Sequence, residues 1–398
     1  MLESKESLLI LFTERKKETP NTLFYEKKFN DQYKTKIIYI SDYLNINNHN
    51  IAKNINEVIN KEKISLVLFQ GDGLSIMDTK FIRLIDNKVK KGIFSWDDPM
   101  YHHTNRITAS ACDFVLSGCP ISVLKFQELG YKAFFLPVES SSSVFKDLKE
   151  KKIYDVLFFG RQKNNRSKYL EYLKKNNIKV LECGPYDEIS NTFEKLNKLI
   201  NQSKIILNFT EQDNSKYSYN PLSSFKYQFT LRGRAYFIGL CGALCISEYD
   251  PSAELLFKNN ELPFFTSENE CLSLIRRYLS DESKLAEATK KYNIKCMEFE
   301  DKIYMKKTKL FINEISKTKN NLILQLPFWY EFSCFKKNIQ IRFRQNQFLS
   351  FYSQVYNSLF KDKYENKRLI PIIFILGIIS SIMFLIKSPF SKKRYEKI

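Results

Sequence analysis

Short apolar runs alternate with amphipathic stretches along most of this chain. Each run spans about four to eight residues and is rich in Ile, Val, Leu and Phe, which is typical of strands buried on both faces. The stretches between them repeat their apolar residues at helical spacing, so the alternation predicts βαβ units around a parallel sheet. In the first part of the chain the predicted strands are SLLILF (7–12), KIIYI (36–40), ISLVLF (64–69), KGIFSW (91–96), CDFVLSG (112–118) and KAFFLPV (132–138).

A polar segment with four serines, VESSSSVFKDLKEKK (138–152), interrupts this pattern and predicts a linker. The alternation then restarts, so we expect one α/β domain at 1–145 and a second at 151–316. Two such domains place a ligand in the cleft between them, at the carboxyl ends of the strands. The predicted strands of the second domain are YDVLFFG (154–160), KVLECG (179–184), KIILNF (204–209) and ALCIS (243–247).

The last part of the chain has a different composition. Aromatic residues alternate with Lys and Arg in region 317–368, which predicts either helices that pack back on the domains or a surface that faces anionic lipid. Segment 369–386 has eighteen residues without a charge, about 27 Å as a helix, and therefore predicts a transmembrane helix followed by a basic tail at 387–398. A buried core helix is the alternative for 369–386. Because the first apolar run is too short for a signal peptide, we expect a membrane-associated protein with a cytoplasmic catalytic part.

The formal net charge of +19, from 63 basic and 44 acidic residues among 398, raises the question of a nucleic-acid partner. The basic residues are scattered, however, and Asn, Ile, Phe and Tyr are abundant together with Lys. We therefore expect no nucleic-acid partner, and an attraction to anionic substrates or lipids instead. The eight cysteines form no CxxC pair, which indicates reduced thiols and neither disulfides nor a metal site.

One stretch, LRGRAYFIGLCGALCISEYDPSAELLF (231–257), combines several groups that suit an anionic ligand. A helix that begins near Arg234 would present free backbone N–H groups, and Arg232 and Arg234 would add guanidinium donors that suit phosphate oxygens. Gly242 would let the backbone approach a ligand closely. The alternative is a pair of surface arginines followed by a solvated acid.

This stretch resembles the C-terminal block of the spore-protein CgeB-like glycosyltransferases, which are related to glycosyltransferase families 1 and 4. The family pattern is an Asn after a strand, Arg-x-Phe-Glu, small residues, Cys-Gly, an apolar strand, Thr-Glu, and Glu-x-x-Phe. The resemblance implies a GT-B fold of two Rossmann-like parallel-sheet domains that face a cleft, with the acceptor half first and the nucleotide-sugar half second. The matching residues are Asn208, Arg234, Cys241, Gly242, Glu248, Glu254 and Phe257.

Two further blocks extend the resemblance. Gly160 and Arg161 lie at the turn that opens the nucleotide-binding half, and Asp97 and Asp98 lie in GIFSWDDPMY, which is similar to an Asp-Asp-Pro loop of the acceptor half. The chain departs from the pattern at Phe237, where the family usually has a Glu that is expected to bind hydroxyl groups of the donor.

The resemblance implies transfer of a sugar from a nucleotide-diphosphate donor to an acceptor hydroxyl. Arg161, Arg232 and Arg234 would stabilise the leaving diphosphate without a metal or cofactor. Asp97 or Asp98 would take the acceptor proton if the enzyme inverts, because adjacent carboxylates raise one pKa; a helix cap is the alternative for both.

Glu248 is a further catalytic candidate, and Glu254 is expected to bind the donor. We expect a glycan or a lipid-linked acceptor and a role in surface polysaccharide or glycolipid assembly. The second hypothesis is a non-catalytic nucleotide-sugar-binding relative, and the third is a basic nucleic-acid-binding protein.

Overall fold

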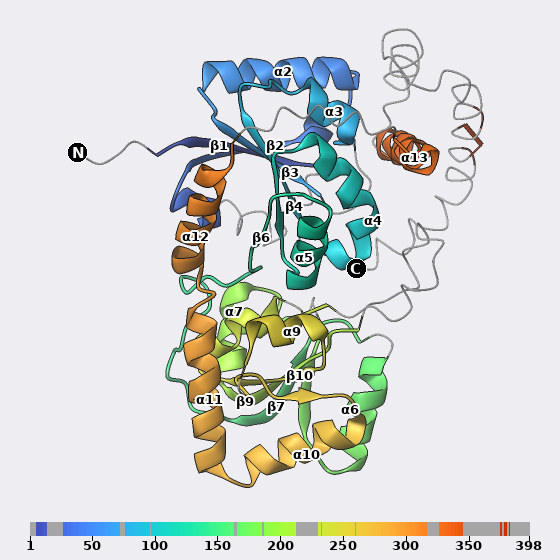
Figure 1. Ribbon diagram of the computed structural model, residues 1–398. Helices are drawn as coiled ribbons and strands as arrows, with labels where there is room; N and C mark the ends of the chain where they lie inside the picture. The colour runs from blue at the N-terminus through green and yellow to red at the C-terminus, as the bar shows by residue number, and fades with distance from the viewer. Residues whose placement is uncertain are drawn as a thin grey trace.

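The computed structural model shows two α/β units stacked end to end, each built on a parallel sheet (Figure 1). The chain crosses twice between the units. The residues that the structure describes are 5–13, 27–71, 76–95, 97–162, 165–184, 187–211, 230–231, 233–258, 260–316, 326–344, 375, 378, 379 and 382.

The N-terminal unit contains a six-stranded sheet in the order β2-β1-β3-β4-β5-β6, with every strand parallel to its neighbours. Alternate residues of β1 lie in two different hydrophobic clusters, Leu9 and Leu11 in one and Leu8 and Ile10 in the other. Both faces of the sheet are therefore buried, which explains the continuous apolar runs. The elements are β1 (Ser7–Phe12), β2 (Lys34–Tyr39), α2 (Asn48–Lys61), β3 (Leu66–Gln70), α3 (Thr79–Leu84), β4 (Lys90–Ser95), α4 (Asp98–Thr108), β5 (Phe114–Ser117), α5 (Pro120–Glu128) and β6 (Ala133–Phe135).

The C-terminal unit contains a five-stranded parallel sheet in the order β11-β10-β9-β7-β8. The strand order reverses next to β7, so the carboxyl ends of β7 and β9 form a switch point of the kind that binds ligands in open α/β sheets. The elements are β7 (Tyr154–Phe159), α6 (Asn165–Lys175), β8 (Val180–Cys183), α7 (Phe193–Asn201), β9 (Ser203–Asn208), α8 (Arg234–Phe237), η5 (Gly239–Cys241), β10 (Leu244–Glu248), α9 (Pro251–Leu256), β11 (Phe264–Phe265), α10 (Glu268–Leu279) and α11 (Glu282–Met297).

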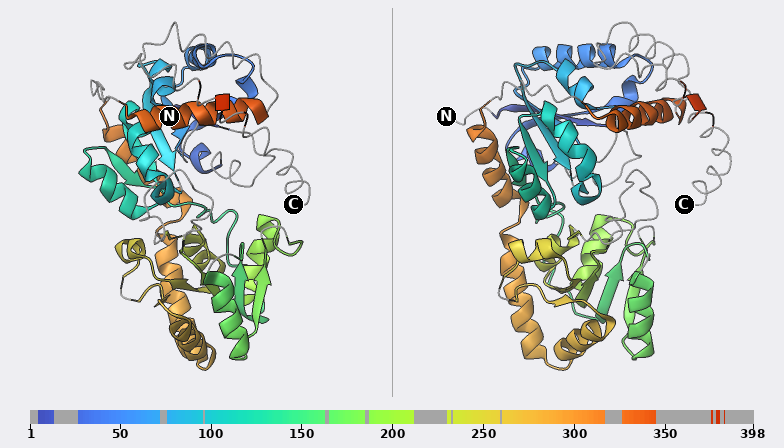
Figure 2. Two further views of the ribbon diagram at one scale, coloured as in Figure 1. Left: turned by 90° about the vertical axis from the view of Figure 1, so that its right-hand side faces the viewer. Right: turned by 45° about the vertical axis from the view of Figure 1, so that its right-hand side comes forward.

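Helix α12 (Asp301–Glu314) returns to the N-terminal unit, where it lies beside the first sheet (Figure 2). Met305, Ile312 and Ile315 are buried in the cluster that contains alternate residues of β1. The Lys90 Nζ atom also donates a hydrogen bond of 2.6 Å to the Ile312 carbonyl oxygen. The predicted end of the second domain at 316 is therefore wrong, because the apolar face of α12 is covered by the first unit.

Helix α13 (Phe328–Arg344) also packs on the N-terminal unit. The Tyr330 hydroxyl lies 3.2 Å from the Thr79 hydroxyl in α3. Arg342 has no exposed surface and donates a hydrogen bond of 3.0 Å to the Ile46 carbonyl oxygen. Helix α13 therefore packs back on the N-terminal unit, as one of the two alternatives for region 317–368 predicted. Residues 317–325 and 345–368 lie outside the described part of the chain, so a lipid-facing surface there stays a prediction.

No helix in the described part of the chain is long and apolar enough to cross a membrane. The predicted span 369–386 lies outside the described residues except at four isoleucines, and the predicted tail 387–398 lies outside them entirely. The transmembrane helix therefore stays a prediction.

Candidate active site

The two units touch where the chain leaves β6 and where α8 begins. A β-carbon built on Gly233 would lie 3.1 Å from the Val138 carbonyl oxygen. The absence of a side chain at Gly233 therefore allows the two backbones to approach this closely. This contact brings the carboxyl end of β6 next to Arg234.

The Arg234 guanidinium lies at the turn that follows β7. Its Nη1 atom donates a hydrogen bond of 2.6 Å to the Phe159 carbonyl oxygen, and its Cζ atom lies 4.8 Å from the centre of the Phe159 ring. Gly160 has a φ of +129°, and a β-carbon there would lie 3.0 Å from the Arg234 Nη2 atom. The structure thus brings together Gly160 and Arg234, two residues that the sequence predicted for donor binding. Arg161 is exposed at the next position, and Arg232 lies outside the described residues.

Helix α8 is only four residues long and continues as the 3-10 turn η5, whereas the sequence predicted one helix over residues 234–241. Gly239 packs so tightly against α11 that a β-carbon there would lie 2.5 Å from the Cys296 sulfur. Because a single helical turn has little macrodipole, the predicted anion site depends on the Arg234 charge rather than on leading amides.

Gly242 lies at the amino end of β10, on the edge of the sheet opposite to Arg234. Its φ of +69° ends η5, and the Lys152 Nζ atom donates a hydrogen bond of 2.8 Å to its carbonyl oxygen. A β-carbon would also lie 3.1 Å from the carboxyl carbon of Asp147. The structure therefore does not bring Gly242 together with the other predicted donor residues. A glycine is favoured at this position because of the positive φ and the close approach of Asp147.

Asn208 and Glu248 lie at the carboxyl ends of β9 and β10. The Asn208 side chain donates a hydrogen bond of 2.8 Å to the Ser247 hydroxyl, and its buried Oδ1 atom has no hydrogen-bond partner among the described residues. The Glu248 carboxylate accepts hydrogen bonds from the backbone amides of Thr210, at 2.8 Å, and Glu211, at 2.9 Å. Glu248, predicted to be catalytic, therefore holds the turn after β9.

Glu211 is a candidate that the sequence analysis missed. Burial and the neighbouring charge of Glu248 raise its pKa, while the Asn165 amide at the start of α6 and the Arg166 charge lower it. Its Oε2 atom is buried, and no described residue forms a hydrogen bond with it. Its place just past the predicted strand 204–209 could have identified Glu211, in the same way that Glu248 follows the predicted strand 243–247.

Glu254, predicted to bind the donor, is exposed in the first turn of α9. Burial and a hydrogen bond with Glu254 raise the pKa of Tyr249. The structure therefore places this carboxylate on the surface, beside the end of β10.

Phe237 is part of the hydrophobic core. It is 2% exposed, and its ring stacks on Phe145 with ring centres 3.9 Å apart. It also lies 6.2 Å from the Phe159 ring. The departure from the family pattern at this position therefore contributes to the packing of the hydrophobic core.

The two adjacent acids of the N-terminal unit have different surroundings. Asp98 is fully buried, with its Oδ2 atom 2.9 Å from His102 Nδ1 and its Oδ1 atom accepting a 2.7 Å hydrogen bond from Asn105. Asp97 precedes α4 but makes no side-chain capping hydrogen bond, and its charge raises the pKa of Glu139. Asp98 is therefore engaged inside α4, whereas Asp97 lies near the chain crossing.

Glu139 is a second candidate that the sequence analysis missed, because it lies in the predicted linker. It is half-buried and has a φ of +57°. Burial raises its pKa, Arg234 and Lys28 lower it, and Asp97 and Asp301 raise it. Charged groups from both units therefore surround this carboxyl group.

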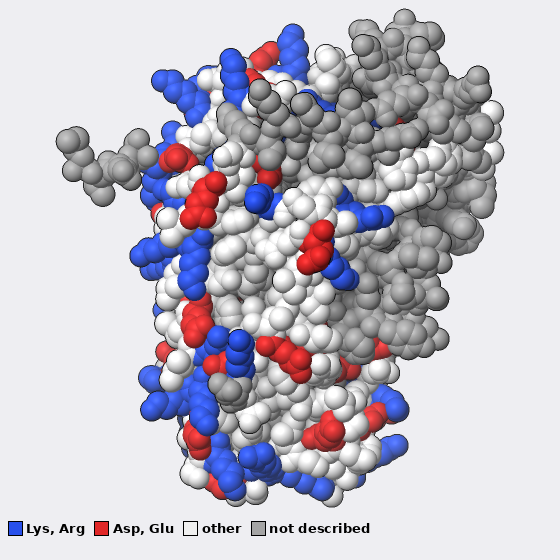
Figure 3. Space-filling view, viewed as in Figure 1, with Lys and Arg blue, Asp and Glu red and all other residues white. Residues whose placement is uncertain are grey.

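The remaining predictions concern metals, thiols and surface charge. Among the residues that the structure describes, no group of three or more His, Cys, Asp or Glu side chains is arranged to hold a metal ion. All eight cysteines are buried free thiols. On the face drawn in Figure 3, Lys and Arg side chains are spread over both units and interspersed with Asp and Glu.

The stacking of two parallel α/β sheets is the arrangement of the GT-B fold. Sucrose-phosphate synthase from Thermosynechococcus elongatus superimposes with a TM-score of 0.52 and 7% identity, over 78% of this chain and 99% of that one. HepE from Anabaena in complex with UDP-glucose superimposes with a TM-score of 0.51 and 9% identity, over 76% of this chain and 99% of that one. At these identities the comparison shows the fold alone.

Residues 145–296 match the family described as "Glycosyl transferase-like". The matched segment begins in the linker, covers β7 to β11 and ends in α11, so it contains Gly160 and Arg234. The C-terminal unit is therefore similar to a glycosyltransferase-like domain, within a chain that has a GT-B fold. Comparison with curated proteins found no match.

Proposed function

We propose that this protein is a glycosyltransferase that moves a sugar from a nucleoside-diphosphate donor to an acceptor hydroxyl. The observation that carries the proposal is the Arg234 guanidinium, fixed at the carboxyl end of β7 by the Phe159 carbonyl oxygen and packed against Gly160. It lies inside the glycosyltransferase-like domain and beside the contact between the units. The complex of HepE with UDP-glucose supports a nucleotide-sugar as the class of donor.

The chemistry of sugar transfer explains why a fixed guanidinium would accelerate it. Negative charge accumulates on the diphosphate as its bond to the anomeric carbon breaks. A cation held in place before the reaction stabilises this charge more in the transition state than in the ground state. We assign this role to Arg234, with Arg161 and Arg232 as additional phosphate ligands.

For an inverting reaction we propose Asp97 as the general base. It lies on the acceptor side of the crossing, close enough to Glu139 to raise the pKa of that group. Asp98 is fully buried and hydrogen-bonded to His102 and Asn105, so we assign it a role in positioning α4.

The biological setting is also part of the proposal. The sequence motifs favour a CgeB-like enzyme that acts on a glycan or a lipid-linked acceptor in surface polysaccharide or glycolipid assembly. Segment 369–386 would hold the enzyme at a membrane. Membrane fractionation tests this point: we expect the full chain to sediment with membranes and a chain ending at Tyr364 to stay in solution.

The function is tested by titrating the full-length protein with nucleoside diphosphate sugars and then measuring nucleoside diphosphate release with and without acceptor. Arg234→Lys keeps the charge but loses the planar fork, and we expect donor affinity to fall at least about tenfold. Arg277→Lys is the matched control, because Arg277 also lies over an aromatic ring, at 5.7 Å, but on the exposed face of α10. Binding of no donor would refute the proposal, and binding without transfer would favour the non-catalytic relative.

A further inference from the structure

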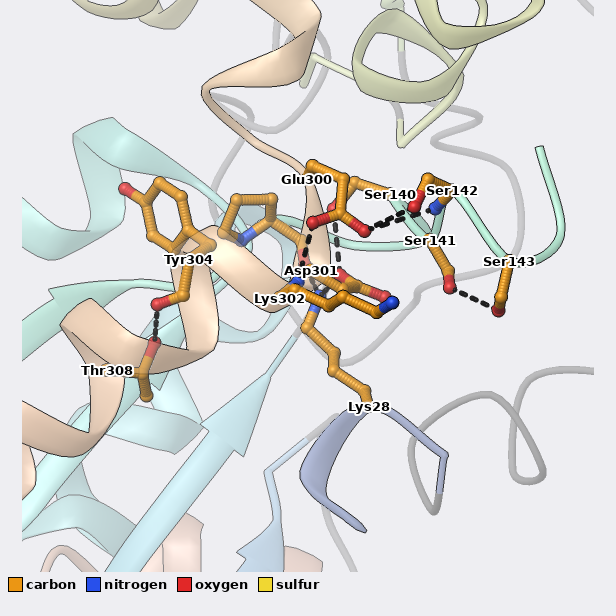
Figure 4. Close-up of polar contacts among 11 residues, drawn as sticks. Lys28, Ser140, Ser141, Ser142, Ser143, Glu300, Asp301, Lys302, Tyr304 and Thr308 are labelled. Atoms are coloured by element: carbon orange, nitrogen blue, oxygen red, sulfur yellow. Dashed lines mark hydrogen bonds and ion pairs between the residues drawn. The ribbon is translucent and has the colours of Figure 1, made fainter. Parts of the chain in front are cut away.

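The chain segment that crosses between the units is held by contacts of residues before and after Glu139. Figure 4 shows Lys28, Ser140 and Asp301, which make these contacts. Before it, the Lys28 ammonium donates a hydrogen bond to the Pro137 carbonyl oxygen and lies 2.7 Å from the Asp301 carboxylate. After it, the Ser140 hydroxyl donates a hydrogen bond of 2.9 Å to Asp301, whose amide donates one of 3.2 Å to the Ser140 carbonyl oxygen. The Lys28 and Asp301 side chains are 0% and 4% exposed, so water does not compete for these contacts.

This fixed backbone forces Glu139 into an unfavourable conformation. Its φ of +57° is in the left-handed region, which a residue with a β-carbon rarely adopts. Such a conformation persists only where the surrounding contacts determine it, and it is concentrated at functional sites. Among the non-glycine residues with positive φ, Lys63, Asn177 and Asn260 lie within one unit, whereas Glu139 and Lys149 lie in the segment that crosses between the units. Of these two, Glu139 follows Val138, which contacts Gly233 beside Arg234.

The neighbours of Glu139 place it beside the proposed diphosphate site. The preceding residue, Val138, contacts Gly233, and the next residue after Gly233 is Arg234. Burial raises the Glu139 pKa, and the positive charge of Arg234 opposes this shift. A carboxylate here would repel a phosphate but would accept hydrogen bonds from neutral hydroxyl groups, because it has acceptors only.

We propose that Glu139 binds the sugar of the donor, accepting hydrogen bonds from its hydroxyl groups while Arg234 binds the diphosphate. This inference rests on the proposed function and assigns a sugar-recognising residue within it. The donor site is then completed by both units: the C-terminal unit supplies the diphosphate ligand, and the crossing segment supplies the sugar ligand.

The experiment compares binding of UDP with UDP-glucose, and of GDP with GDP-mannose, by calorimetry on the full-length protein. Glu139→Gly removes the carboxylate and the backbone strain together, so the variant stays folded. We expect its nucleotide-sugar affinity to fall about 10- to 100-fold, as the loss of a hydrogen bond to a charged group implies. Its affinity for the nucleoside diphosphate alone stays within about threefold. Glu139→Gln keeps a neutral acceptor, and we expect a smaller loss.

Lys63→Gly is the matched control. Lys63 has a φ of +51° just beyond α2, so its replacement by glycine relieves the same kind of backbone strain far from the crossing. It should change neither affinity. A parallel loss of UDP and UDP-glucose binding in Glu139→Gly would overturn the sugar contact, and so would unchanged binding of both. In either case the proposed function would stand. Failure of the wild type to bind any of the four compounds would overturn the proposed function and this inference together.

Discussion

Replacing Gly160 with alanine tests the geometry of the candidate site most directly. The new β-carbon would lie 3.0 Å from the Arg234 Nη2 atom, on a backbone with a φ of +129°. The unfavourable φ costs about 1–3 kcal/mol. Displacing the guanidinium would also break its hydrogen bond to the Phe159 carbonyl oxygen, which is worth about 1.5–3 kcal/mol for a charged donor. We therefore expect a destabilisation of about 3–5 kcal/mol.

Gly130→Ala separates the two contributions. Gly130 also has a positive φ, +82°, but a β-carbon there would meet nothing within 4 Å. This variant should be destabilised by only about 1–2 kcal/mol, the cost of placing alanine in this backbone conformation. Thermal unfolding of both variants measures the difference, at about 2–4 °C per kcal/mol for units of this size.

Nucleotide-sugar binding provides the second readout for the same pair of variants. If Arg234 binds the diphosphate as proposed, Gly160→Ala should bind the donor at least about tenfold more weakly, because the guanidinium charge has moved. Gly130→Ala should bind it normally. If Gly160→Ala bound the donor as tightly as the wild type, the assignment of Arg234 to the diphosphate would be refuted.

Three further substitutions test other parts of the structure. Arg342→Met leaves backbone carbonyls such as that of Ile46 unpaired, and should cost about 3 kcal/mol by thermal unfolding while exposing α13 to proteolysis; Arg277→Met should do neither. Burial raises the pKa of Asp78 to about 6, so its neutral form is favoured on folding and its contribution to stability is lost as pH rises from about 4 through 6. Asp78→Asn should therefore stabilise the protein by about 3 kcal/mol at pH 7, and the effect should disappear as the pH falls below about 4. A difference independent of pH would contradict this. Phe237→Glu buries a carboxylate in the core and should cost more than about 4 kcal/mol, whereas Phe237→Leu should leave a folded protein.

The strands could be predicted from the sequence because both faces of each sheet are buried. A run such as Ser7–Phe12 is apolar at consecutive positions, and the structure places its alternate residues in two separate clusters. The position of α12 could not be predicted in this way. Its sequence shows that one face is apolar, but not which of two units covers that face.

The positions of candidate residues could be predicted where they follow directly after a strand, as for Gly160 after β7 and Asn208 at the end of β9. Gly242 precedes the predicted strand 243–247 and therefore lies at the amino end of β10, away from Arg234; the family pattern, and not its place relative to the strand, made it a candidate. Glu139 could not be identified from the sequence for another reason. Its conformation depends on contacts such as that between Lys28 and Pro137, 109 residues apart, which no local pattern reveals.

The return of α12 has a consequence for how the protein is made. Because Met305, Ile312 and Ile315 cover one face of the first sheet, the segment that folds into the second unit is inserted within the first. A nascent chain that has left the ribosome only as far as residue 145 would carry a bare apolar sheet face. We expect a fragment of that length to aggregate, and co-expression of a peptide carrying 301–315 to rescue it.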